Sequence, residues 1–234
     1  MNTSQSEISV INNTIVNKDI KIDKSLYTNS SKKFAYRATK RILDILLSSI
    51  ALIILFPVFL LIGIFIKIDS KGPVFFAHNR IGKSGKLIHI YKFRTMVPDA
   101  EAMIQDFDEK MMKEFKENYK LKNDPRITKV GKFLRKTSLD ELPQIWNILI
   151  GDLSIVGPRP VIKEELEKYG KNKNKFLSII PGLTGYWQAN GRSTTTYEDR
   201  MKMELYYVDN RSLWLDVKIF FKTIISVFKK EGAI

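Results

Sequence analysis

Cysteine is absent from the 234 residues, and histidine occurs only at His78 and His89. The first absence excludes disulfide bonds and cysteine-ligated zinc sites. The second means that catalysis must rely on carboxylates, lysines and arginines, and we expect both histidines to be structural. Acidic residues are also fewer than basic ones: the chain has 25 Asp and Glu and 39 Lys and Arg, which gives a formal net charge of +14. This excess predicts anionic partners: phosphates, nucleotides, acidic lipids or nucleic acid.

Three regions follow one another along the chain. Residues 1–31 lack the apolar core and small-residue cleavage site of a secretory signal, and we expect a mobile tail there. Residues 32–68 contain the one long hydrophobic run and are expected to associate with a membrane. Residues 69–234 are expected to form the cytoplasmic domain that carries the chemistry.

The hydrophobic run extends from Ile42 to Ile66, and its only charged residue is Asp44. About 20 apolar residues suffice to span a bilayer. A buried core helix is the alternative, but such helices rarely stay apolar on every face for so long. Basic residues flank both ends, and the positive-inside rule would keep both ends in the cytoplasm. These flanking residues are Lys32, Lys33, Arg37, Lys40 and Arg41 before the run, and Lys67, Lys71, Arg80, Lys83 and Lys86 after it.

Pro57 lies past the middle of this run and supplies a place for the helix to break, because proline removes a backbone donor and clashes with the preceding turn. A re-entrant helix that enters, turns near Pro57 and returns satisfies the charge rule. An ordinary spanning helix with a proline kink is the alternative, and the residues alone leave both open.

The remaining pattern predicts an α+β fold: a small helical domain with a short β-hairpin, after the membrane helix. Two short strands, Val74–Ala77 and Leu87–Tyr91, flank a glycine-containing turn at residues 82–86. Residues 100–120 have the charge and spacing of an amphipathic surface helix, and further helices are predicted at 139–149 and 161–169. Residues 211–230 combine aromatic and basic side chains. That pattern suits an interfacial amphipathic helix, with packing on the domain core as the alternative.

The densest chemical motif is the adjacent pair Asp140-Glu141, which lies in a basic stretch of residues 124–144. Neighbouring cations are expected to lower the pKa of the aspartate and keep it ionised. An ionised aspartate can attack phosphorus and form an acyl phosphate, while the glutamate holds Mg²⁺ or manages a proton. The alternative is a helix capping box, in which Ser138 caps the helix and Glu141 reaches back.

Basic residues around this pair are candidate ligands for substrate phosphates. Arg135 precedes the dyad by five residues, and Arg159 lies in a rigid loop between two prolines. Lys92 and Arg94 alternate with aromatic residues and are expected to share one strand face. The full set of predicted substrate-binding residues is Arg80, Lys92, Arg94, Arg126, Arg135 and Arg159.

The motif Arg135-Lys136-Thr137-Ser138-Leu139-Asp140-Glu141-Leu142-Pro143-Gln144 resembles the signature of the bacterial sugar transferases, the monotopic polyprenyl-phosphate phosphoglycosyl transferases. The resemblance covers Lys40 to about Lys222. It continues through Arg80-Ile81-Gly82, Tyr91-Lys92-Phe93-Arg94-Thr95-Met96, Gly157-Pro158-Arg159-Pro160, Pro181-Gly182-Leu183-Thr184-Gly185, Asn190-Gly191-Arg192 and Trp214-Leu215-Asp216.

This resemblance implies a ping-pong transfer at the bacterial inner membrane. Asp140 would attack the sugar-linked phosphorus of a UDP-sugar and release UMP. Polyprenyl (undecaprenyl) phosphate would then take the phosphosugar, as the first membrane step of exopolysaccharide or glycoconjugate synthesis. The implied cofactor is Mg²⁺ at Asp140 and Glu141, and the implied partners are the UDP-sugar, the lipid phosphate and the membrane, with no nucleic acid.

The sequence is expected to differ from other family members in two respects. Family members break the re-entrant helix at a Ser-Pro pair, whereas this sequence has Phe56-Pro57. Larger members carry four spanning helices and an extra domain, and we expect this sequence to correspond to the minimal catalytic form.

Two other classes of protein compete with this interpretation. A membrane-anchored basic protein that only binds nucleic acid or acidic lipid would explain the charge, but it has no use for an adjacent Asp-Glu pair in a basic cluster. A phosphatase with an aspartyl nucleophile commonly shows an Asp-x-Asp motif after an apolar strand, and no strand here is followed by one.

Overall fold

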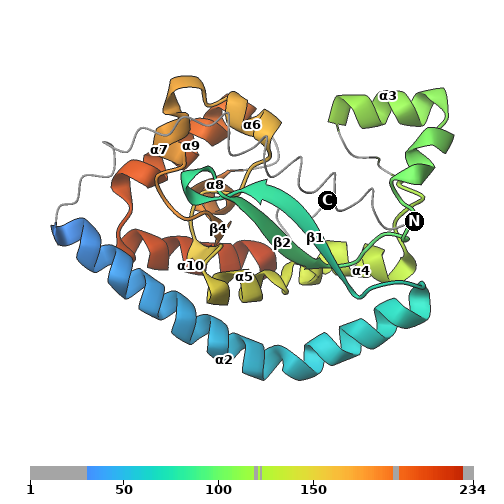
Figure 1. Ribbon diagram of the computed structural model, residues 1–234, viewed down its shortest axis with the longest axis horizontal. Helices are drawn as coiled ribbons and strands as arrows, with labels where there is room; N and C mark the ends of the chain where they lie inside the picture. The colour runs from blue at the N-terminus through green and yellow to red at the C-terminus, as the bar shows by residue number, and fades with distance from the viewer. Residues whose placement is uncertain (1–30, 119–120, 122, 192–194, 229–234) are drawn as a thin grey trace. The chain divides into compact units, whose positions relative to one another are not determined.

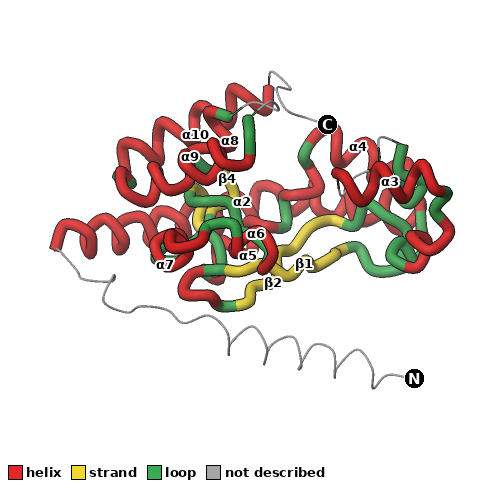
Figure 2. The backbone as a smooth tube through the Cα atoms, turned by 90° about the horizontal axis from the view of Figure 1, so that it is seen from above, coloured by secondary structure: helices red, strands yellow, loops and turns green. Residues whose placement is uncertain are grey.

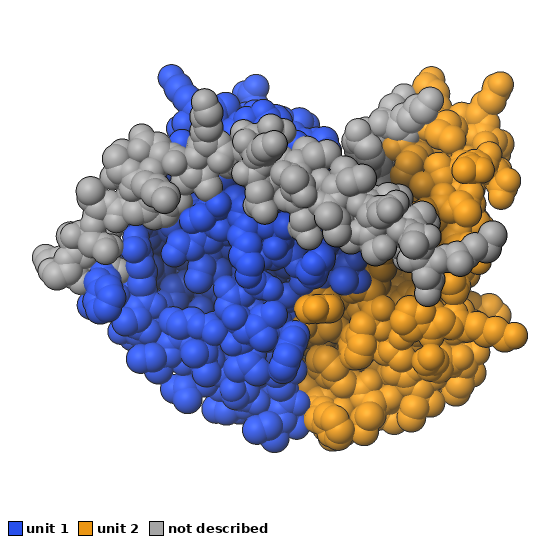
Figure 3. All heavy atoms as spheres, viewed as in Figure 1, with its two compact units in different colours: residues 1–53, 77–90, 144–232 blue, residues 54–76, 91–143, 233–234 orange. Residues whose placement is uncertain are grey.

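The computed structural model describes residues 31–118, 121, 123–191 and 195–228, so the predicted tail lies outside the described residues except for Ser31. Helices alternate with two small two-stranded sheets (Figures 1 and 2), which confirms a mixed helical and β fold. The chain divides into two compact units (Figure 3). Among the described residues, unit 1 comprises 31–53, 77–90 and 144–228, and unit 2 comprises 54–76 and 91–143.

One helix, α2 (Ser31–Asp69), covers the whole hydrophobic run and continues through Pro57. Within the described residues it alone is long and apolar enough to cross a membrane. Asp44 and Ser48, one turn apart, are buried in unit 1, and Ile62 and Ile66 are buried in unit 2. Most other apolar side chains of α2 are exposed. This large apolar surface indicates membrane association.

Polar contacts fasten α2 at both ends. The Arg41 guanidinium donates to the carbonyl oxygens of Ile148 and Leu149 at 2.6 and 2.7 Å, which satisfies the end of α5 (Gln144–Ile150). Asp44 accepts a hydrogen bond from the Ile155 backbone N–H at 3.0 Å. At the other end, Asp69 accepts one from the Val130 N–H at 2.9 Å. The one charge of the hydrophobic run therefore serves a buried structural contact.

The predicted hairpin is confirmed. β1 (Phe75–Ile81) pairs with β2 (Leu87–Phe93), and the short 3₁₀ turn η2 (Lys83–Gly85) joins them. The Gly82 N–H donates to the Lys86 carbonyl at 2.7 Å and closes the turn. β1 extends four residues beyond the predicted end, because Ile81 also bridges to Val161 in an antiparallel sense.

A second sheet, which the sequence did not suggest, lies in unit 1. β3 (Ser154–Val156) and β4 (Gly182–Thr184) pair in parallel, with Ser154 opposite Gly182 and Val156 opposite Thr184. A Cβ atom on Gly182 would stand 2.1 Å from the Gly157 nitrogen, so only glycine allows this approach. The sheet holds in place the Pro158-Arg159-Pro160 loop that follows β3.

Helices complete unit 1. The predicted helix at 161–169 is shorter in the structure, where α6 (Lys163–Glu167) is followed by η5 (Gly170–Asn172) and α7 (Lys173–Phe176). α8 (Tyr186–Asn190), α9 (Tyr197–Asn210) and α10 (Leu213–Phe228) follow β4. One core cluster joins these elements through Val156, Ala189, Tyr207 and Ile219. Asp216 accepts hydrogen bonds from the Tyr207 hydroxyl at 2.6 Å and from Lys40 at 2.8 Å.

The single helix predicted over residues 100–120 is wrong. The chain forms η3 (Ala102–Asp106), breaks, and starts α3 (Glu109–Asn118). The break has a local cause: the Asp108 carboxylate accepts a hydrogen bond from the Met111 N–H at 2.7 Å. An aspartate in this position starts a helix rather than continuing one.

The segment around the Asp-Glu pair also differs from prediction. Instead of one helix over 139–149, α4 (Lys129–Thr137) leads into the 3₁₀ turn η4 (Leu139–Glu141), and α5 begins after Pro143. Ser138 joins α4 to η4 in the left-handed region, with φ 55° and ψ 18°, and its side chain makes no capping hydrogen bond. The capping-box interpretation is therefore wrong, because Glu141 pairs with Lys92 instead.

This geometry predicts different effects from two substitutions of Ser138. Ser138→Gly should raise the free energy of unfolding by about 1 kcal/mol, because glycine carries no left-handed penalty. Ser138→Ala should change it by less than about 0.5 kcal/mol. Denaturant unfolding of the detergent-solubilised chain measures both. A loss of about 1 kcal/mol in Ser138→Ala, the usual cost of removing a cap, would instead support the capping box.

Candidate functional site

Asp140 and Glu141 occupy the short turn between α4 and α5 in unit 2. The turn places the two carboxylates in different environments: the Asp140 side chain is 13% exposed and the Glu141 side chain 41%. α4 reaches this position through a close contact with the segment after β2, since a Cβ on Gly131 would lie 2.0 Å from the Thr95 carbonyl oxygen. The dyad is therefore fixed by backbone packing on one side of unit 2.

Lys92 joins the two carboxylates. Its ammonium nitrogen lies 2.6 Å from Glu141 Oε1 and 3.7 Å from Asp140 Oδ2. The adjacent strand residue, Phe93, is 1% exposed and packs with Ile62, Ile66 and Leu134. Because neighbouring strand residues point to opposite faces, this buried ring holds Lys92 toward the dyad. The geometry brings Lys92, Asp140 and Glu141 together.

The electrostatics of Asp140 contradict one expectation. Burial raises the pKa of the Asp140 carboxyl above its ordinary value, and the adjacent Glu141 charge raises it further. Lys92 and Arg135 act in the opposite direction and offset only part of this increase. The neighbouring cations lower the pKa of Asp140 as expected, but the expectation that its pKa lies below the ordinary value is wrong, because the loss of hydration is the larger effect.

Arg135 is the other cation close to the dyad, and its charge favours the ionised form of Asp140. The Arg135 Nε donates to the hydroxyl oxygen of Thr95 at 2.9 Å. Within the described part of the chain, the two terminal amino groups of Arg135 make no hydrogen bond. They are the pair that a bidentate phosphate or carboxylate contact requires.

Arg94 and Arg126, two of the predicted substrate ligands, have protein partners in the structure. Arg94 is buried and donates to the carbonyl oxygens of Lys71 and Ser70 at 2.9 and 2.8 Å. Arg126 forms a two-pronged pair with Asp124, through Nε at 2.8 Å and Nη2 at 2.7 Å. Both guanidinium groups contact protein groups of unit 2, and their binding of substrate stays a prediction.

Arg80 and Arg159 lie in unit 1 rather than with the dyad in unit 2. Burial lowers the pKa of Arg80, and the positive charges of Arg159 and Arg200 lower it further. Arg200 and the fully buried Glu204 were missed from the sequence, in which no element was predicted over residues 197–210. Their spacing of four residues, which places both on one helix face, was the only available signal.

The two carboxylates of the dyad are oxygen ligands, the kind that Mg²⁺ prefers. Among the described residues no group of three or more His, Asp or Glu gathers anywhere. Mg²⁺ usually takes one or two carboxylates and completes its shell with water and substrate phosphates. The pair Asp140-Glu141 fits that pattern. The Lys92 ammonium group lies between the two carboxylates and shows that a positive charge is favoured there.

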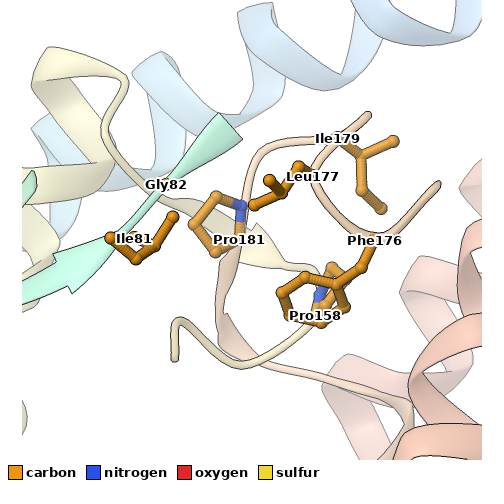
Figure 4. A pocket seen from close by; sticks show the side chains of 7 residues that line it. All are labelled: Ile81, Gly82, Pro158, Phe176, Leu177, Ile179 and Pro181. Carbon is orange, nitrogen blue, oxygen red and sulfur yellow. The ribbon is translucent and has the colours of Figure 1, made fainter. Parts of the chain in front are cut away.

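A narrow pocket in unit 1 is lined by Pro158 and its neighbours (Figure 4). The side chains that line it are nonpolar and include Ile81, Pro158, Leu177 and Pro181, and its space does not admit a water molecule. It carries no charged group and cannot recognise a phosphate. We interpret it as a packing defect.

Comparison with known proteins identifies the family of the chain. The family model described as "Bacterial sugar transferase" matches residues 35–230. The chain is 44% identical over 209 residues to an undecaprenyl-phosphate galactose phosphotransferase of Salmonella typhimurium, covering 88% of this chain and 44% of the relative. It is 41% identical over 202 residues to a UDP-glucose:undecaprenyl-phosphate glucose-1-phosphate transferase of Klebsiella pneumoniae, covering 83% and 41%.

A shorter relative matches over most of its length. The exopolysaccharide production protein ExoY of Rhizobium meliloti is 44% identical over 197 residues, covering 83% of this chain and 87% of the relative. By contrast, the chain spans less than half the length of the Salmonella and Klebsiella proteins. Because the family model covers more than four-fifths of the sequence and includes the whole of the Asp140-Glu141 region, the chain belongs to the bacterial sugar transferase family.

Proposed function

We propose that the protein transfers a sugar-1-phosphate from a UDP-sugar to polyprenyl phosphate in exopolysaccharide or glycoconjugate synthesis. The observation that carries this proposal is the half-buried Asp140-Glu141 pair bridged by Lys92, in a chain of this family. The names of the Salmonella and Klebsiella relatives support undecaprenyl phosphate as the acceptor. UDP-linked donors are named for the Klebsiella relative and for its Escherichia coli counterpart.

In the first step, a carboxylate oxygen of Asp140 attacks the phosphorus that carries the sugar. A new O–P bond forms and the bond to the bridging oxygen of the diphosphate breaks, so that UMP leaves with that oxygen. The sugar phosphate stays on Asp140 as an acyl phosphate. The raised pKa of Asp140 makes its ionised form more basic, which favours attack, while Lys92 and Arg135 keep that form populated.

In the second step, a phosphate oxygen of the polyprenyl phosphate attacks the same phosphorus. The Asp140 carboxylate leaves with its original charge, and the product is a polyprenyl-diphosphate-sugar. We expect the terminal amino groups of Arg135, which make no hydrogen bond within the described residues, to neutralise charge on the transferring group. Mg²⁺ held by Asp140 and Glu141 would supply further charge stabilisation at the diphosphate.

We predict that Asp140→Asn lowers the transfer rate by at least about 1,000-fold, since an amide cannot form the acyl phosphate. Glu141→Gln should lose most of the activity while the protein still folds. UMP release from a UDP-sugar with Mg²⁺ and a polyprenyl phosphate measures both. Asp99→Asn, at an exposed position of the same unit, is the control and should keep the wild-type rate.

Intact mass tests the covalent step separately. The wild-type chain incubated with UDP-sugar alone should gain the mass of one phosphosugar, and Asp140→Asn should not. If Asp140→Asn retains substantial turnover, or if initial-rate lines intersect in double-reciprocal plots, direct attack by the lipid phosphate replaces the two-step path.

A second prediction concerns pH. Attack requires the ionised carboxylate, so kcat/KM should fall as pH decreases through the pKa of Asp140, and that pKa is raised. Lys92 is the largest influence that lowers it. Lys92→Met should therefore move the acid limb of the profile to higher pH, whereas Lys92→Arg, which keeps the charge, should move it less. A uniform rate loss with an unmoved limb would refute this electrostatic role.

We also propose that α2 is re-entrant, so that both of its ends face the cytoplasm, where UDP-sugars are made. A straight helix of 39 residues would be about 58 Å long, nearly twice the ~30 Å bilayer core. Basic residues lie on both sides of the apolar run, and the positive-inside rule favours a cytoplasmic location for both ends.

α10 supports the same arrangement as an interfacial helix. Trp214, Phe221 and Ile225 are 67%, 59% and 54% exposed, and Lys218 and Lys222 lie on the same helix. Aromatic and basic side chains together suit the boundary between headgroups and acyl chains. We propose that α10 rests there while the middle of α2 enters the bilayer.

Cysteine labelling tests the topology cleanly, because the chain has no native cysteine. Phe34→Cys and Lys71→Cys introduce thiols at exposed positions on either side of the apolar run. Both should react in intact cells only with a membrane-permeant reagent. Reaction of the residue 34 thiol with an impermeant reagent would show a straight span and leave the catalytic proposal untouched.

A further inference from the structure

Three arginines from distant parts of the sequence converge in unit 1: Arg80 at the end of β1, Arg159 after β3, and Arg200 on α9. Backbone contacts enforce this convergence. The Ile81 N–H donates to the Val161 carbonyl at 2.8 Å, which fixes the end of β1 beside the loop that contains Arg159. The Arg159 N–H in turn donates to Glu204 Oε1 at 3.2 Å, one helical turn from Arg200.

The charges of this cluster do not balance. Two carboxylates oppose the three guanidinium groups: Glu165, 3.8 Å from Arg200 Nη1, and Glu204. Glu204 is fully buried, and burial raises its pKa to about 7, so near neutrality it supplies only part of a negative charge. Burial lowers the pKa of Arg80, and the charges of Arg159 and Arg200 lower it further against the opposite effect of Glu165. A bound anion would relieve the repulsion among the three cations.

Hydrogen bonds at the centre of the cluster are also incomplete. Arg200 is 9% exposed, and its Nε and Nη2 have no partner among the described residues. Glu204 Oε2 and the Tyr169 hydroxyl are likewise buried without a partner there. The Arg200 guanidinium stacks 4.4 Å from the Trp187 ring, which fixes its orientation. Buried donors without a partner destabilise the fold, so their presence indicates that this site serves a purpose beyond packing.

The three arginines differ in solvent exposure, and this difference indicates which of them would contact a ligand. Arg80 and Arg159 are half-buried and retain solvent contact, so they offer the surface that a ligand meets. Arg200 is buried and contributes charge rather than a surface that a ligand meets. A planar guanidinium pair held on a rigid loop and a strand end matches the two-oxygen edge of a phosphoryl group.

We propose that Arg80, Arg159 and Arg200 form a phosphoryl-binding site in unit 1, with Arg80 and Arg159 as ligands and Arg200 as the positioning cation. The proposal rests on the proposed function, because a phosphoryl group is what the nucleotide donor and the lipid acceptor share. Glu204 holds the site through the Arg159 backbone. The dyad with its neighbours Lys92 and Arg135 belongs to unit 2.

Equilibrium binding to the full chain in detergent, with EDTA present, tests the site without turnover. The three probes are UDP, farnesyl phosphate and inorganic phosphate. Arg80→Gln and Arg159→Gln should each weaken at least one probe by about ten-fold or more, as loss of a charged hydrogen bond predicts. Arg200→Gln should do the same, and Arg159→Lys should restore part of the affinity.

Lys202→Gln is the matched control, since this exposed lysine lies on α9 between Arg200 and Glu204. It should bind every probe within about two-fold of wild type, because surface charges contribute little. Weakening of UDP alone identifies the nucleotide as the ligand, and weakening of farnesyl phosphate alone identifies the lipid. Equal weakening of all three probes identifies a general phosphate site.

The proposal fails if Arg80→Gln and Arg159→Gln, both folded by circular dichroism, bind all three probes as wild type does. It also fails if wild type binds none of them. Either result is distinguishable from failure of the proposed function, which is measured by UMP release and by the mass of the Asp140 adduct. The Arg80 and Arg159 variants decide between these outcomes even if Arg200→Gln does not fold.

Discussion

The ammonium group of Lys92 lies between two carboxylates that would otherwise repel each other in a partly buried turn. The packing of β2 and α4 in unit 2 holds the ammonium group in this position. Its distances of 2.6 Å to Glu141 and 3.7 Å to Asp140 require β2 to present Lys92 toward the turn, and buried Phe93 ensures this. They also require α4 to end beside β2, which Gly131 permits by lying against the Thr95 carbonyl. Without the cation, burial and like charge would act together to neutralise Asp140.

A similar constraint governs α2, in which apolar residues dominate but a few polar ones decide its position. Arg41 satisfies two carbonyl groups at the end of α5, and Asp44 satisfies a backbone donor at β3. Each contact removes a buried polar group that would be costly to leave unpaired. A helix surrounded by lipid alone would have no use for these residues, so they mark the face of α2 that belongs to the protein.

The sequence predicted features that depend on local pattern. The hairpin follows from alternating apolar residues around Gly82 and Gly85, and the dyad stands out because two carboxylates occur in a basic stretch. It failed where a contact with a distant residue or an unusual backbone decides the outcome. The left-handed Ser138, the Asp108 cap that divides residues 100–120, and the three-residue strands β3 and β4 carry no periodic signal. The pKa of Asp140 was predicted in the wrong direction because charge is readable from sequence, whereas burial is not.

The basic residues show this limit of prediction from sequence most clearly. The sequence alone does not distinguish arginines that stabilise the fold from those that are available to a ligand. The structure separates them by their partners. Arg126 donates two hydrogen bonds to the Asp124 carboxylate, and the two terminal amino groups of Arg41 donate to carbonyl oxygens of α5. Binding a phosphate would cost each of them these hydrogen bonds.

Arg135 and Arg200 differ in that groups of the described residues leave part of their hydrogen-bonding capacity unused. A fold optimised only for stability would pair or replace such groups, since unpaired buried donors and crowded cations both oppose folding. Their persistence at two places, one in each unit, fits a protein whose stability is limited by the need to handle phosphate. By this criterion, Arg94 is intermediate: its terminal amino groups hold Ser70 and Lys71, while its buried Nε has no partner within the described residues.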